Sequence, residues 1–156
     1  MIIIISTSIA SVLRQVAQSS AYTGAKRQDD PKAQDPDALD RISTVDEDTD
    51  ELTHFFNELR IPLAEAFSSI INEEGISIDG DTYNLSLNVY DGFNQALLPV
   101  MNYNLFSYFV DGILGAWLSY MNLDGAERYA ASSANLLVQL KGSTFQRAFT
   151  RKMYPY

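Results

Sequence analysis

The sequence predicts a mainly α-helical fold: an antiparallel helical bundle of about three to four helices, with a small β-hairpin and an extended N-terminal strand. Three observations lead to this fold class. Apolar residues recur at steps of three and four over long stretches, which is the period of a helix. Between residues 76 and 89 the period changes to two, the period of a strand. The chain opens with Ile2–Ile5, a β-branched run that favours extended backbone.

The length of 156 residues suits one domain, 1–156, with a single hydrophobic core. Residues 1–7 are expected to form the N-terminal strand or arm. A strand this short is not stable alone, so it must pair with a sheet edge in its own domain or in a neighbouring molecule.

A first helix is expected from about Ser8 to Thr23, because apolar residues follow Ser8 at helical spacing. Gly24 is its expected stop. Residues 26–43 contain two prolines, many aspartates and almost nothing to bury. This composition predicts an acidic, mobile linker.

The core is expected over residues 44–146, as a helix, a hairpin and two more helices. Thr44 and Glu47 have the spacing of a capping box, so the first of these helices should begin there. Pro62 should kink this helix, because proline removes one backbone hydrogen bond. Gly75 should end it.

Asp79-Gly80 suits a tight hairpin turn, so Ile76 and Ile78 are expected opposite the alternating strand 83–89. A long helix is expected over 103–121, and a last helix should fold back against it. Asp124 and Glu127, with capping-box spacing, should open that last helix.

Gly112 and Gly115 interrupt the helix expected over 103–121. Glycine lowers helix stability by roughly 1 kcal/mol relative to alanine, so these residues indicate a neighbouring helix that comes close. The basic and aromatic residues 147–156 are expected to form a C-terminal arm.

The formal net charge of −9 and the pI of about 4.4 argue against nucleic acid and against an anionic membrane surface as partners. We therefore expect no sequence-specific nucleic-acid binding. No stretch has the roughly 20 clean apolar residues of a membrane-spanning helix, so no membrane association is expected.

The sequence offers little catalytic chemistry. It has no cysteine, and the single His54 lies in a periodic helix without a nucleophile motif. Residues 46–57 resemble a calcium loop, but Glu51 and Asn57 stand where glycine and glutamate are needed. We expect a non-enzyme with no catalytic residue, no cofactor and no metal site.

Asp111 lies in an apolar run and has two interpretations: a polar position at the helix edge, or a buried polar contact to another helix or chain. The acidic stretch within residues 26–51 also has two interpretations. It is either a solvated loop, or a flank that meets the basic tail of the next copy and sets the register of the contact.

Both chain ends indicate a homo-oligomer, because neither end folds by itself. The residues expected at the subunit interface are Ile2, Ile3, Ile4, Ile5, Lys141, Arg147, Arg151, Lys152, Tyr154 and Tyr156.

The order of parts, with an amphipathic helix, a central hairpin, two antiparallel helices and an arm-like tail, resembles the head-to-tail connector (neck, or ring) proteins of tailed bacteriophages. Three segments are similar to small structural proteins of phages and prophages of gut Bacteroidetes. These are residues 1–6 leading into 21–26, residues 40–44, and residues 106–118 around Trp117.

The resemblance implies a virion structural protein, assembled in the host cytoplasm. Identical subunits would form a ring at the head-tail connector or in a tail completion layer, through helix packing and terminal-arm exchange. Portal and tail proteins would be its partners, and the family has no catalytic signature. Many connectors are entirely helical, so the opening strand is a departure. Two other interpretations stay open: a cellular adaptor or regulatory protein-binding module, and a carboxylate-based metal-dependent hydrolase.

Overall fold

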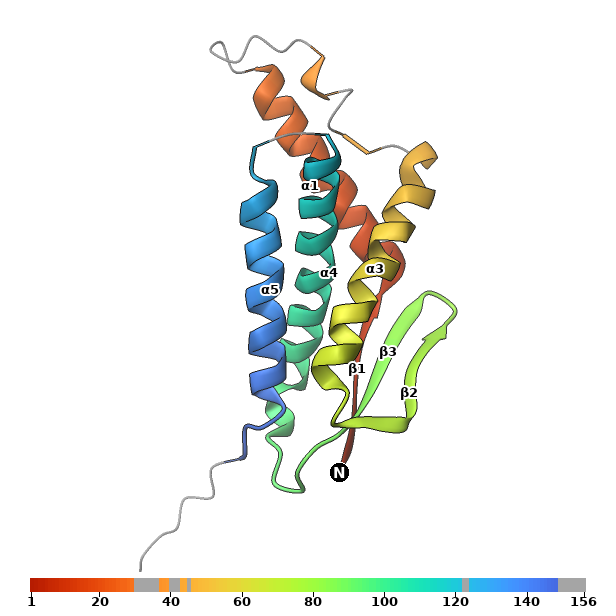
Figure 1. Cartoon of the computed structure of the whole chain (residues 1–156), viewed down its shortest axis with the longest axis vertical. Coiled ribbons are helices and arrows are strands. Elements are labelled where there is room, and N and C mark those ends of the chain that lie inside the picture. The colour runs from red at the N-terminus through yellow and green to blue at the C-terminus, as the bar shows by residue number, and fades with distance from the viewer. Residues whose placement is uncertain (30–36, 40–42, 45, 122–123, 149–156) are drawn as a thin grey trace, which may run out of the picture.

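The computed structural model describes residues 1–29, 37–39, 43–44, 46–121 and 124–148. The fold is mainly helical, as the sequence predicts, and it includes a small antiparallel sheet (Figure 1). The elements in order are β1 (Ile2–Ser8), α1 (Ile9–Gln28), α3 (Thr49–Phe67), β2 (Ile71–Asp79), β3 (Thr82–Asn88), α4 (Leu98–Tyr120) and α5 (Ala126–Ser143), with short 3-10 helices η1 (Asp46–Asp48) and η2 (Gln95–Leu97).

The sheet has three antiparallel strands in the order β1-β3-β2. The sequence predicted a hairpin and an N-terminal strand that pairs in its own domain or in a neighbouring molecule, and the structure shows one three-stranded sheet, because β1 pairs with β3 along its whole length, from Ile2 opposite Asn88 to Ser8 opposite Thr82. Ile3 and Ile5 point into the core from β1. Burial of these side chains fixes the register, since a slip by one residue would expose them.

The hairpin itself is confirmed, with Ile76 and Ile78 on the strand opposite β3 and Gly80 at φ +61° in the turn. The expected end of the preceding helix at Gly75 was wrong. Helix α3 ends at Phe67, and Gly75 lies inside β2 at φ +59°, where the pairing register shifts. A glycine at positive φ is typical of a β-bulge.

Helix α1 passes through Gly24 and ends at Gln28, so the expected stop at Gly24 was wrong. A Cβ atom on Gly24 would lie 2.9 Å from the Cα of Leu39. The glycine therefore allows two backbone segments to approach closely. Residues 26–28 of the expected linker belong to α1, and residues 30–36 and 40–42 lie outside the described residues.

Both expected capping boxes were wrong. Helix α3 begins at Thr49, after η1, and the backbone N–H of Thr44 instead donates to the Ser20 hydroxyl at 3.1 Å. Helix α5 begins at Ala126, with Gly125 in the N-cap position. Pro62 lies inside α3, and the helix runs without a break from Thr49 to Phe67.

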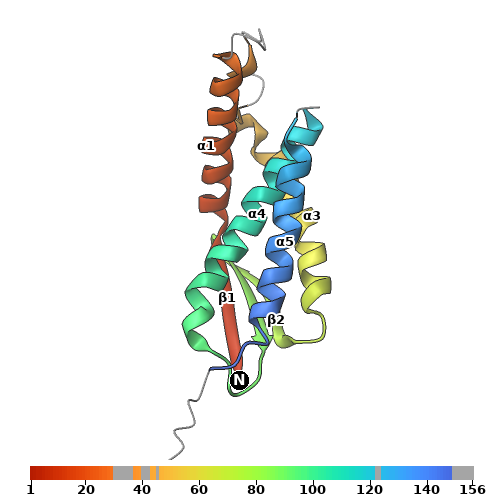
Figure 2. The ribbon, with the colours of Figure 1, turned by 90° about the vertical axis from the view of Figure 1, so that its left-hand side faces the viewer.

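Helix α4 is the central element and packs against α1, α3, α5 and β1. Helices α4 and α5 run antiparallel side by side (Figure 1). Figure 2 shows α1 alongside α4 and extending past its C-terminal end. Within the described ranges, no helix is both long and apolar enough to cross a membrane.

Gly112 and Gly115 mark two close contacts of α4, as expected. A Cβ atom on Gly115 would lie 3.1 Å from the backbone nitrogen of Ala130 in α5. At Gly112 the nearest atoms belong to the Leu59 side chain of α3 and to the Ser133 hydroxyl of α5. The glycines thus bring the neighbouring helices close to α4.

Candidate interaction surface

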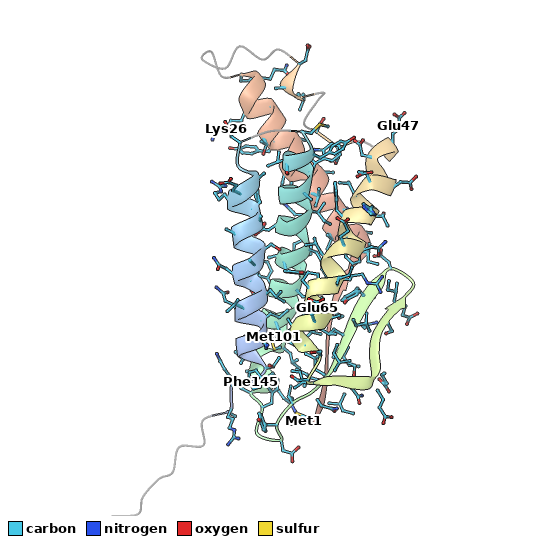
Figure 3. All side chains as sticks on the ribbon, viewed as in Figure 1. Met1, Lys26, Glu47, Glu65, Met101 and Phe145 are labelled. Atoms are coloured by element: carbon cyan, nitrogen blue, oxygen red, sulfur yellow. The ribbon has the colours of Figure 1, made fainter. Side chains whose placement is uncertain are left out.

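The N-terminus and the last described residues lie together at one end of the molecule. The backbone N–H of Val89 donates to the Met1 carbonyl at 2.8 Å, and the N–H of Ala148 donates to the Gly92 carbonyl at 2.8 Å. Figure 3 shows Met1 and Phe145 at the end opposite Lys26 and Glu47. We call this the basal end.

Large apolar side chains are exposed at the basal end. Ile2 and Tyr90 are each 56% exposed and Phe145 is 48% exposed. The rings of Tyr90 and Phe145 are 6.5 Å apart, and Ile2 lies opposite Asn88 on the paired strands. Tyr90 and Phe145 line a cavity of about 270 Å³, and its other lining residues are Ile70, Asn88, Val89 and Thr144. We call Ile2 and these lining residues the basal patch.

Charged groups border the basal patch. The Asp91 side chain is almost fully exposed and lies 3.1 Å from the N-terminal amine. The Arg147 guanidinium lies 5.1 Å from the centre of the Tyr90 ring, which is a cation–π distance. An apolar centre with a charged rim is the usual composition of a protein interface.

The structure exposes some of the residues expected at a subunit interface and buries others. Ile2 and Ile4 are exposed, whereas the side chains of Ile3 and Ile5 are buried in the chain's own core. Arg147 lies at the basal patch, and Lys141 is exposed in the last turn of α5. The remaining four, Arg151, Lys152, Tyr154 and Tyr156, lie outside the described residues.

Tyr90 and Phe145 were not among the residues expected at a subunit interface. A signal for Tyr90 was present, because it continues the alternation of Asn84, Ser86 and Asn88 on one face of β3. Phe145 had no such signal. Its position depends on the pairing of Phe93 with Arg147, which brings distant parts of the chain together.

A second apolar groove, of about 230 Å³, lies between α3 and α5 and is lined by Leu59, Pro62, Tyr108, Gly112, Ala130, Ser133, Ala134 and Leu137. Its polar atoms are already paired. The Tyr108 hydroxyl donates to the Leu59 carbonyl at 2.7 Å, and the Ser133 hydroxyl donates to the Tyr108 carbonyl at 3.0 Å. Burial raises the pKa of Tyr108, so its hydroxyl stays protonated at neutral pH. The groove therefore offers no ionised group for acid–base chemistry.

The ionisable groups of the described residues form no group of three or more His, Cys, Asp or Glu side chains that could hold a metal. His54 pairs with Glu58 at 3.1 Å on the surface of α3, and both side chains are more than half exposed. Asp111 accepts a hydrogen bond from Ser132 of α5 at 2.6 Å. Asp111 is half-buried, so it contacts a neighbouring helix without being a buried polar residue, and the structure combines the two interpretations.

Comparisons with protein-family models, with curated proteins and with solved structures found no match to this chain.

Proposed function

We propose that this chain is a non-enzymatic structural subunit that assembles with further copies of itself. The observation that carries the proposal is the basal patch, where exposed apolar side chains surround a cavity at the end of the molecule that holds the N-terminus.

Burial of these side chains by a partner would be favourable. Fully burying one large apolar side chain is worth roughly 1.5–3 kcal/mol relative to leaving it in water. Tyr90 and Phe145 belong to the aromatic class that is enriched at interfaces and dominates their binding energy. The cavity beside them gives an incoming side chain a place to enter.

The resemblance to phage head-to-tail connectors extends this proposal. In that role, identical subunits form a ring between portal and tail in the virion, with the helices acting as an antiparallel bundle that holds the basal patch in place. A ring needs a heterologous contact, in which one surface of a subunit meets a different surface of the next. Terminal arms provide such a contact, because an arm and its receptor are separate parts of each subunit.

The mass of the full-length protein in solution, measured over a range of concentrations, tests assembly. We expect a species larger than the 17.4 kDa chain. Ile2→Lys places a charge in the basal patch and should shift the equilibrium to monomer. Val138→Lys is the matched control, because Val138 is 71% exposed on α5 and is not part of the patch. A wild-type protein that stays monomeric at every concentration contradicts the proposal.

The connector role has its own test, which uses the portal and tail proteins encoded by the same genome. A complex with either, detected by co-elution of purified proteins, is the expected result. Self-assembly without binding to portal or tail protein would support the structural role and contradict the connector role.

A further inference from the structure

We infer that the basal patch of one copy receives the C-terminal arm, residues 149–156, of a neighbouring copy. The inference rests on the proposed self-assembly and names the segment that joins the copies.

The arm begins beside the patch. The last described residue, Ala148, is held by the Gly92 carbonyl, two residues from Tyr90. The eight residues that follow span at most about 26–29 Å when fully extended. This length is enough to leave one subunit and cross a patch of a few side chains on the next.

The last described residues lie beside the patch. The chain at Arg147 runs antiparallel to Phe93, and hydrogen bonds on both sides of this pair fix that segment. The proposed self-assembly assigns the arm to a neighbouring copy, because an arm that occupied the patch of its own molecule would join no subunits.

The arm and the patch are chemically complementary. The arm carries four apolar or aromatic side chains and two bases, with no acid: the apolar residues are Phe149, Met153, Tyr154 and Tyr156, and the bases are Arg151 and Lys152. The patch offers exposed aromatic rings around a cavity that is also lined by the exposed polar residue Asn88. An aromatic side chain of the arm fits this setting, because its ring fills apolar space and a tyrosine hydroxyl finds a polar partner.

The charges at the rim of the patch help to orient the arm. Asp91 is exposed beside the patch and is opposite in sign to Arg151 and Lys152 of the arm. Such pairs at a rim contribute to register and association rate more than to affinity. Salt should therefore slow assembly.

Two full-length variants test the inference. Tyr90→Glu damages the patch and leaves the arm intact, whereas the double variant Met153→Glu, Tyr154→Glu damages the arm and leaves the patch intact. Each variant alone should have the 17.4 kDa mass of the monomer. An equimolar mixture should form a one-to-one dimer of twice that mass, because one intact arm and one intact patch remain. Val138→Glu, an exposed residue outside both, should assemble like the wild type.

The outcomes separate the inference from the proposed function. Wild-type assembly with a mixture that stays monomeric overturns the arm-to-patch contact and leaves self-assembly standing. An arm variant that assembles like the wild type also overturns it. A monomeric wild type refutes the proposed function itself. Circular dichroism of each variant shows whether it is folded, so that loss of assembly is not mistaken for loss of structure.

Discussion

Asp81 accepts a hydrogen bond from the backbone N–H of Ala10 at 2.8 Å, although 71 positions separate the two residues in sequence. The Ser8 hydroxyl donates to the same carboxylate. The turn between β2 and β3 thus supplies a negative charge and a hydrogen-bond acceptor to the first turn of α1. Both favour the start of a helix, whose first N–H groups have no partner within the helix.

Replacement of this carboxylate should destabilise the protein by an amount typical of a lost helix cap. We expect Asp81→Ala to lower the free energy of unfolding by about 1 kcal/mol. Asp81→Asn keeps an acceptor and should cost less. Urea unfolding followed by circular dichroism measures both, and an Asp81→Ala protein as stable as the wild type would contradict a capping role.

Two buried tyrosines should respond in opposite ways to loss of the hydroxyl. Tyr108 donates to the Leu59 carbonyl at 2.7 Å, so Tyr108→Phe should cost about 1 kcal/mol and leave that carbonyl without this partner. The Tyr83 hydroxyl is buried with no hydrogen-bond partner among the described residues. Tyr83→Phe should therefore be neutral or stabilising, since the ring contacts with Phe56 and Phe109 remain. Thermal unfolding of the two variants checks the difference, and equal losses would contradict it.

The same tyrosines predict a loss of stability at alkaline pH. Burial raises the pKa of both Tyr83 and Tyr108, and for Tyr83 the nearby Arg60 guanidinium partly opposes this. Unfolded tyrosine ionises near pH 10, so above that pH the folded state binds more protons than the unfolded state. The stabilisation is complete below about pH 10 and is lost as the pH rises further.

Melting temperatures between pH 8 and 11 measure this effect. We expect the wild type to lose stability above about pH 10, and Tyr108→Phe to lose less over the same interval because it has one fewer group to ionise. Identical pH profiles for the two proteins would show that ionisation of Tyr108 does not limit stability.

The periodic signals of the sequence predicted the type of each long element, but not where several of them end. Gly24, Gly75 and Gly115 illustrate why. Gly115 was correctly interpreted as a close approach of helices, whereas Gly24 and Gly75 were interpreted as helix stops. The role of Gly24 depends on Leu39 and that of Gly75 on pairing with β3, and neither partner belongs to the local pattern.

The candidate site was predictable only in part, for the same reason. The exposed Ile2 belongs to a run that stands out in the sequence. The residues around Ile2 do not stand out in the sequence. Ile2 is brought beside Asn88 by the pairing of β1 with β3, and Phe145 is brought beside Tyr90 by the pairing of Arg147 with Phe93. Long-range pairing determines these contacts, and hydrophobic periodicity carries no information about it.

The glycines of the helix pair α4 and α5 provide a final prediction, because they differ in the space around them. At Gly115 an added Cβ would lie 3.1 Å from the nitrogen and 3.5 Å from the Cα of Ala130, and backbone atoms of α5 cannot move aside as a side chain can. At Gly142, near the end of α5, nothing lies within 4 Å. Gly142→Ala should therefore stabilise the protein by up to about 1 kcal/mol through helix propensity alone.

Gly115→Val should have the opposite effect. The branched side chain forces α4 and α5 apart, and overpacking of this kind costs about 1–3 kcal/mol. Urea unfolding of the two variants beside the wild type gives both free-energy changes in one experiment. A Gly115→Val protein that is as stable as Gly142→Ala would mean that the two helices do not approach as closely at this position as Ala130 and Gly115 indicate.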